Sequence, residues 1–249
     1  MAAMTESILL LLSLGGYASA AVLDRRRLTR AGFFCSLTGV VSHIGFVLVR
    51  YMSTGVLPFA GRAEALLLFA LSIQTAGLLS CLSGRGTAVK AMTDILSTLV
   101  LVIGLILYKT GARELNPALN SPFFAVHILS AFAGYGALVA GLVASVAALS
   151  VPEQRGLSHR LALATLLFLG LGILLGAVWA DRCWGRFWGW DPKETGALIT
   201  WTIVLVFVHI LRFRPRPWLA VLFFMLAALA MLFTFIGVNL LPFGLHRYA

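Results

Sequence analysis

Four of the five histidines occupy positions where an imidazole could bind iron. His127 lies about one turn into a long apolar stretch, and His246 lies in the short tail after the last such stretch. His43 and His209 lie within apolar stretches, where an ionisable side chain is costly and is usually functional. Haem iron accepts imidazole as an axial ligand on either side of the ring. The alternative for His43 and His209 is a neutral imidazole hydrogen-bonded to a neighbouring helix.

A tryptophan-rich segment separates His127 from His209. It reads WADRCWGRFWGWDPKETGALITW over residues 179–201 and holds five of the six tryptophans. Indole rings favour the membrane interface, which explains isolated tryptophans at helix ends. That preference explains less well the crowding of Trp184, Trp188 and Trp190 between glycines that let the backbone turn. Two interpretations stay open: an aromatic shelf for a large flat ligand such as a porphyrin, or a crowded interfacial belt.

The DPKE sequence inside this segment predicts the start of a helix. Asp191 is a favourable N-cap, Pro192 suits the first helical position, and Glu194 falls at the third, as in a capping box. This structural role is expected whether or not Asp191 also borders a bound ligand.

The elements that position these residues are predicted to be membrane helices. The chain is 60% hydrophobic and 11% charged, whereas soluble domains carry about 25% charged residues. Eight apolar stretches approach the roughly 20 residues needed to cross the hydrocarbon core. They cover residues 7–23, 31–49, 65–82, 91–108, 123–149, 161–180, 195–211 and 218–241. We therefore expect an all-α integral membrane protein, a bundle of about eight transmembrane helices forming a single polytopic domain over residues 1–249.

The distribution of charge predicts the orientation. One set of loops holds eleven basic and three acidic residues, a net charge of +8; the opposite set holds eight basic and six acidic residues, a net charge of +2. By the positive-inside rule the first set is cytoplasmic, and the overall charge of +10 needs no nucleic acid to explain it. Both termini and segment 179–201 then lie outside, at the level of His127 and His246.

The three cysteines exclude two classes of protein. Cys35, Cys81 and Cys183 are far apart and form no C-x-x-C or C-x-x-C-H sequence. The chain is therefore neither a c-type cytochrome nor an evident thiol oxidoreductase.

The sequence WGRFWGWDPKETGALITW at 184–201 resembles the signature of the CcsA (ResC) family of cytochrome c biogenesis proteins, haem-handling membrane proteins with a tryptophan-rich (WWD) motif. The DPKE part distinguishes this family from the related CcmC and CcmF branches. The resemblance runs from about the second apolar stretch to the C-terminus. It departs from the usual pattern at Gly196, where the family commonly has tryptophan. Further blocks that fit the family are His43 with Arg50, Pro58 and Glu64, then His127, His209, and NLLPFGLHRY at 239–248.

The resemblance implies a function in cytochrome c maturation of the System II type, at a bacterial inner membrane with the tryptophan-rich segment on the periplasmic face. The chain would bind haem b as a substrate and present it to an apocytochrome c whose C-x-x-C-H thiols form the thioether bonds. Its partner would be a CcsB/ResB-like membrane protein. Whether this chain is itself the haem-binding subunit of a cytochrome c synthase (haem lyase), or only presents haem, stays open at this level.

The resemblance also implies roles for single residues. His127 and His246 would be the axial pair of an outer haem, and His209 an intramembrane ligand; the role of His43 is open. Trp184, Trp188 and Trp190 would hold the porphyrin. Two other classes stay open: a transporter or export channel, for which the sequence shows no inverted repeat, and a purely structural membrane subunit.

Overall fold

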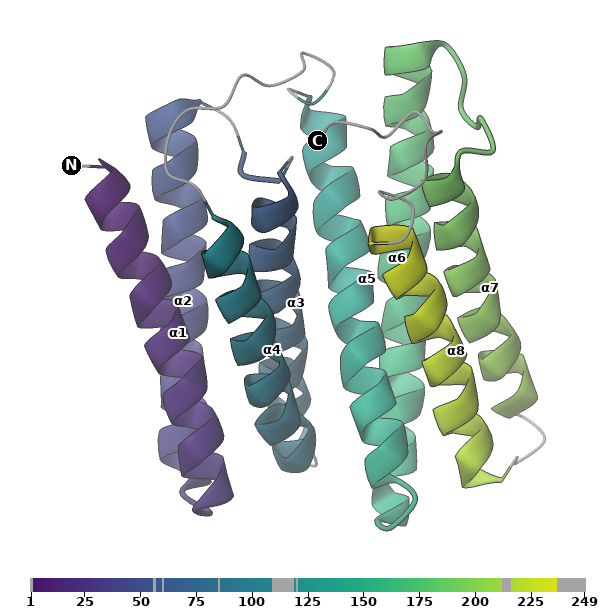
Figure 1. Ribbon diagram of the computed structural model, residues 1–249. Coiled ribbons are helices and arrows are strands. Elements are labelled where there is room, and N and C mark those ends of the chain that lie inside the picture. Colours follow the sequence, from purple (N-terminus) through teal and green to yellow (C-terminus); the bar gives the residue numbers. More distant parts are fainter. Residues whose placement is uncertain are drawn as a thin grey trace. The chain divides into compact units, whose positions relative to one another are not determined.

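The computed structural model describes residues 2–55, 57–59, 61–84, 86–108, 119, 121–211 and 216–236, and all regular structure in these residues is helical (Figure 1). Eight helices are long and apolar enough to cross a membrane, which confirms the predicted all-α, eight-span membrane protein. They are α1 (Ala2–Arg25), α2 (Thr29–Thr54), α3 (Arg62–Leu82), α4 (Thr87–Leu107), α5 (Pro122–Ala147), α6 (Arg155–Trp184), α7 (Pro192–Leu211) and α8 (Pro217–Phe235).

Prolines and glycines set several helix ends. Pro122 and Pro217 occupy the first turns of α5 and α8, where a missing N–H costs no hydrogen bond. Gly55 and Gly185 end α2 and α6 in the left-handed conformation, with φ of 71° and 68°. A short 3-10 turn, η2 (Pro152–Gln154), leads into α6. α6 extends beyond the apolar stretch at both ends, because polar residues can continue a helix past the hydrocarbon core.

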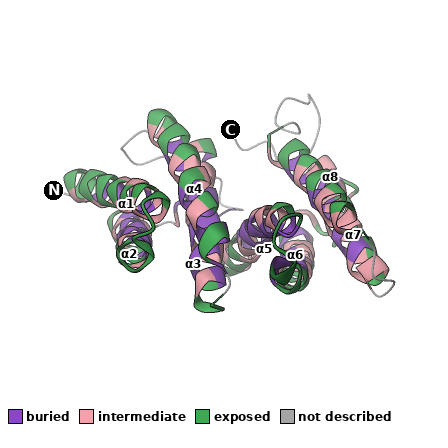
Figure 2. Ribbon diagram, turned by 90° about the horizontal axis from the view of Figure 1, so that it is seen from below, coloured by how far each residue is buried: buried purple, intermediate pink, exposed green. Residues whose placement is uncertain are grey.

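The chain divides into two compact units, Met1–Asn120 and Ser121–Ala249. In the first unit α1 packs on α2 and α4, and α3 packs on α4 and α2. In the second unit α5 packs on α6 and α8, and α7 packs on α8 and α6. Figure 2 shows buried residues where the helices of a unit face one another and exposed residues on their outward faces. A single polytopic domain stays a prediction.

Small residues allow the helices of the first unit to pack closely. A Cβ on Gly16 of α1 would lie 2.7 Å from the Cα atom of Gly39 of α2, so only glycine fits at this crossing. Such small-residue contacts drive helix association in lipid, where apolar side chains gain little by leaving the solvent. Around the crossing Leu10, Tyr17 and Phe46 form part of a buried apolar core.

A buried ion cluster lies at the end of the first unit where α1 begins. The Arg50 guanidinium of α2 lies 3.4 Å from Glu6 Oε2 of α1 and 3.9 Å from Glu64 Oε1 of α3. The Tyr108 hydroxyl, just after α4, donates to Glu6 Oε2 at 2.9 Å. All four helices of the unit are joined here, so Arg50 and Glu64, both in the early family-like block, have a structural role.

Candidate functional site

His127 is held in a defined orientation in the second turn of α5. Its Nδ1 atom lies 2.7 Å from the carbonyl oxygen of Gly172 in α6. A carbonyl can only accept, so Nδ1 carries the hydrogen, and the lone pair of the neutral ring is on Nε2. Metal-binding histidines commonly donate one ring N–H to a backbone carbonyl in this way, which fixes the tautomer and the direction of the ligand nitrogen.

Two glycines of α6 make room for α5, one of them beside this imidazole. Gly172 and Gly176 are four residues apart, so they share one face of the helix. A Cβ on Gly176 would lie 2.6 Å from His127 Nδ1, and a Cβ on Gly172 would lie 3.0 Å from the backbone nitrogen of Ala131. α5 and α6 therefore approach closely because side chains are missing at these two positions.

Trp179 connects His127 to the tryptophan-rich segment. Its buried indole stacks on the His127 ring with centroids 6.1 Å apart and an interplanar angle of 11°. The indole also packs against Phe124 at 5.1 Å and meets Trp184 edge-on at 5.0 Å. The structure thus brings His127 and Trp184 together through an indole that the sequence analysis placed in the segment but did not single out.

The loop between α6 and α7 presents aromatic rings at its surface. Trp188 and Trp190 meet edge-to-face with centroids 5.8 Å apart. Phe187 and Trp190 are 59% and 72% exposed, which makes them the accessible part of the segment. Trp190 has a φ of 54°. A bulky residue in this region costs about 1–3 kcal/mol and keeps this conformation only where its surroundings hold it there.

Glu194 and Asp191 hold the loop in this conformation. Glu194 Oε2 accepts hydrogen bonds from the backbone N–H groups of Gly189 at 2.8 Å and Asp191 at 3.2 Å, on either side of Trp190. Asp191 Oδ1 accepts from the Lys193 N–H at 2.8 Å. The predicted capping box and the helix start at Pro192 are confirmed. The contact of Glu194 with Gly189 reaches beyond the capping box and was not predicted.

The segment is anchored to the rest of the second unit at its far end. The indole N–H of Trp201 donates to the carbonyl oxygen of Leu166 in α6 at 2.9 Å. Gly196 is buried, and a Cβ there would overlap the side chain of Thr234 in α8. A tryptophan has no space at position 196 in this packing. The glycine that stands here in place of the usual tryptophan therefore allows α7 and α8 to pack closely.

The structure describes two of the other three predicted histidines. His209, in the last turn of α7, is exposed, and its Nδ1 lies 2.9 Å from the carbonyl oxygen of Leu205 in the same helix. At 1.5 Å per residue it lies about 25 Å along α7 from Pro192. His43 is completely buried in the first unit, where Nδ1 lies 3.3 Å from the Tyr17 hydroxyl. Within the described part of the chain its Nε2 has no hydrogen-bond partner. His246 lies outside the described residues.

Positive charge accompanies the aromatic groups. The Arg182 guanidinium lies 3.9 Å from the ring centroid of Phe123, at the start of α5. Arg186 is exposed in the loop and lies against Gly189. Arginines in such positions can bind the carboxylates of a ligand.

Comparisons with known proteins point to one family. The family model described as "Cytochrome C assembly protein" matches residues 60–246. A "Cytochrome c biogenesis protein CcsA" of Chlamydomonas reinhardtii is 29% identical over 81% of this chain and 64% of its own length. One of Pelargonium hortorum is 26% identical over 82% of this chain and 81% of its own. This chain therefore spans a little under two thirds of the Chlamydomonas relative.

A solved structure shares the fold. "Cytochrome c Heme Lyase CcmF" superposes with a TM-score of 0.65 at 20% identity. The match covers 94% of this chain and 46% of the CcmF chain. This chain thus corresponds to a little under half of that larger protein.

Proposed function

This chain belongs to the cytochrome c assembly protein family, and we propose that it binds haem and presents it for covalent attachment to apocytochrome c. The relatives named for cytochrome c biogenesis support this function. The observation that carries it is the His127 imidazole, whose Nδ1 is bonded to the Gly172 carbonyl so that Nε2 is the ligand nitrogen.

The aromatic segment supports the binding of a flat ring. Trp184 lies one indole away from His127, and Trp188 and Trp190 form an edge-to-face pair in the adjoining loop. Indole faces give a porphyrin a large contact area with little loss of side-chain entropy. In this proposal His127 and His246 are the axial ligands, Trp184, Trp188 and Trp190 contact the ring, and Asp191 borders it.

Charge and position suggest how the haem is oriented. The exposed Arg182 and Arg186, with Lys193, supply positive groups near the loop, and haem propionates are the anions they would pair with. His209 would bind haem deeper in the membrane, about 25 Å along α7. His43, in the first unit, is given no role in binding the outer haem.

The family and the eight apolar helices support a membrane setting for this function. The chain is a multi-pass membrane protein, and we propose that the tryptophan-rich segment faces outward from a bacterial inner membrane, as the charge distribution predicts. The substrates are haem b and an apocytochrome c with a C-x-x-C-H motif, and the partner is a CcsB/ResB-like membrane protein. The axial imidazoles fix the position of the iron, while the thiols of the apocytochrome carry out the bond formation.

The test is the visible spectrum of the protein purified from haem-replete cells. Wild type is expected to show a Soret band with the features of bis-imidazole iron. His127→Ala and His246→Ala are expected to lose haem or to show changed ligation. The matched control is His159→Ala, which removes an exposed imidazole from the opposite end of α6. Wild type without a Soret band, or with a spectrum unchanged by both substitutions, would refute the proposal.

A second experiment separates haem handling from a structural role. Replacing Trp188 and Trp190 together by leucine removes the edge-to-face indole pair, of which Trp190 is exposed. Haem handling predicts loss of mature cytochrome c at a normal level of the membrane protein. A structural role predicts loss of the protein itself.

A further inference from the structure

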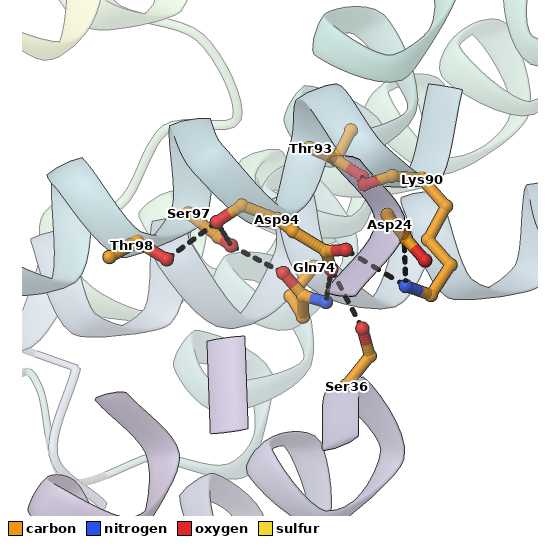
Figure 3. Close-up of polar contacts among 8 residues, drawn as sticks. All are labelled: Asp24, Ser36, Gln74, Lys90, Thr93, Asp94, Ser97 and Thr98. Atoms are coloured by element: carbon orange, nitrogen blue, oxygen red, sulfur yellow. Dashed lines mark hydrogen bonds and ion pairs between the residues drawn. The ribbon is translucent and has the colours of Figure 1, made fainter. Parts of the chain in front are cut away.

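Besides the ion cluster around Arg50, the first unit has a second group of buried charged side chains, which lies near the C-terminal end of α1. Lys90 Nζ of α4 donates to Asp24 Oδ2 of α1 and to Asp94 Oδ2 of α4, both at 2.8 Å (Figure 3). The Lys90 and Asp94 side chains are 0% exposed and the Asp24 side chain is 2% exposed. Asp24 and Lys90 are 66 residues apart, so this centre is a finding of the tertiary structure.

Asp94 has the surroundings of a carboxylate. Its Oδ1 atom accepts from the Ser36 hydroxyl of α2 at 2.7 Å and from the Gln74 amide of α3, while Oδ2 accepts from Lys90. The amide oxygen of Gln74 in turn accepts from the Ser97 hydroxyl (Figure 3). Donors from α2, α3 and α4 thus converge on one acid.

Asp24 is less well satisfied. One of its oxygens accepts from Lys90, whereas Oδ1 is buried and has no hydrogen-bond partner among the residues that the structure describes. This oxygen lies against Gly32 of α2, where a Cβ would overlap it. A buried carboxylate oxygen without a donor is costly, whereas a carboxylic acid group removes that charge.

The three buried groups do not balance one another in charge. Two carboxylates and one ammonium sum to −1, and a net charge inside a membrane-embedded bundle is strongly disfavoured. A hard metal cation such as Mg²⁺ or Ca²⁺ would need about six or more oxygen ligands. Here one carboxylate oxygen lacks a donor and the others are engaged. A proton balances the charge and fits the available space.

We propose that Asp24, Lys90 and Asp94 form a proton-binding site that holds one exchangeable proton on its pair of carboxylates, with Asp24 Oδ1 the oxygen placed to carry it. The proton reaches water at the nearby end of α1, where Asp24 is followed by the exposed Arg25 and Arg26. Because the carboxylates interact through Lys90, the proton belongs to the pair. Uptake and release change the charge inside this unit by one.

Other polar groups near the site come from α2 and α3. α2 contributes the uncharged Ser36, and α3 contributes Gln74 and the Cys81 thiol, which feels the charges of all three groups. The Tyr17 hydroxyl of α1 lies beside His43, 3.3 Å from its Nδ1 atom.

The proposal predicts a count of protonated carboxyl groups that infrared spectroscopy can measure. In the purified full-length protein at neutral pH, the carbonyl band of a protonated acid is compared between wild type and variants. Asp24→Asn and Asp94→Asn each leave one carboxylate beside Lys90, a neutral pair, so each should lose one equivalent of the band. Lys90→Met leaves two carboxylates without a cation and should gain one equivalent.

The asparagine variants are nearly isosteric and keep the test informative if Lys90→Met does not fold. Glu153→Gln is the control, since it removes an exposed acid in η2 and should leave the band unchanged. The wild-type band should shift in D2O, which shows that the proton exchanges. A band that is retained in both asparagine variants, or that does not shift in D2O, would overturn the proposal.

Discussion

Substituting alanine for Gly176 should weaken haem binding without removing any group that touches haem. The new methyl carbon would lie 2.6 Å from His127 Nδ1 and 2.7 Å from Cε1. Nonbonded carbon contacts are about 3.5–4.0 Å, so the imidazole must move by about 1 Å to restore that separation. Such a shift breaks the 2.7 Å hydrogen bond to Gly172 and disturbs the stack on Trp179.

The size of the effect follows from the lost hydrogen bond. A neutral hydrogen bond contributes about 0.5–1.5 kcal/mol, and loss of the partner that orients a metal-binding histidine lowers metal affinity by about 10–100-fold. We therefore expect haem affinity to fall by about one to two orders of magnitude, or roughly 1.4–2.7 kcal/mol. The cost in overall stability should stay within the about 1–3 kcal/mol typical of overpacking.

The assay is an absorbance titration of the purified haem-free protein with haem. Gly156→Ala is the matched control, because it makes the same change in the same helix where a Cβ meets nothing within 4 Å. In a His127→Ala background the substitution of Gly176 should have little further effect, since the two residues act through one contact. A folded Gly176→Ala protein with wild-type affinity and spectrum would refute the assignment of His127 as an oriented ligand.

Three further predictions concern the scaffold. Glu194→Ala removes an acceptor of two backbone N–H groups. A hydrogen bond to a charged group contributes about 1.5–3 kcal/mol, so hydrogen exchange in the loop before α7 should accelerate by about 10–100-fold. Arg50→Met leaves the Glu6 carboxylate buried without its cation and should destabilise the first unit by about 3–5 kcal/mol in thermal unfolding, with Glu6→Gln in the same background restoring part of the loss. Gly77→Ala would overlap the Thr93 side chain and should lower thermal stability by about 1–3 kcal/mol, an effect that Thr93→Ala should relieve in part.

Several features were determined by the sequence alone because they depend on neighbouring residues. A run of apolar residues of sufficient length specifies a membrane helix, since the backbone can satisfy its hydrogen bonds in lipid only within the segment. The eight predicted spans match the eight helices for this reason. The capping box at Asp191 and Glu194 was equally readable, because its partners are three residues apart.

The contacts of His127, and those of Lys90 with the two aspartates, were decided by the tertiary structure. His127 and Gly172 are 45 residues apart, and the acceptor is a backbone carbonyl, which every residue type has. The sequence therefore does not reveal which carbonyl accepts from the imidazole. Lys90 and Asp94 are one helical turn apart and could have been paired from their spacing, but Asp24 is 66 residues before Lys90. Which remote groups meet is set by how the helices pack, and that depends on where glycines let two backbones approach.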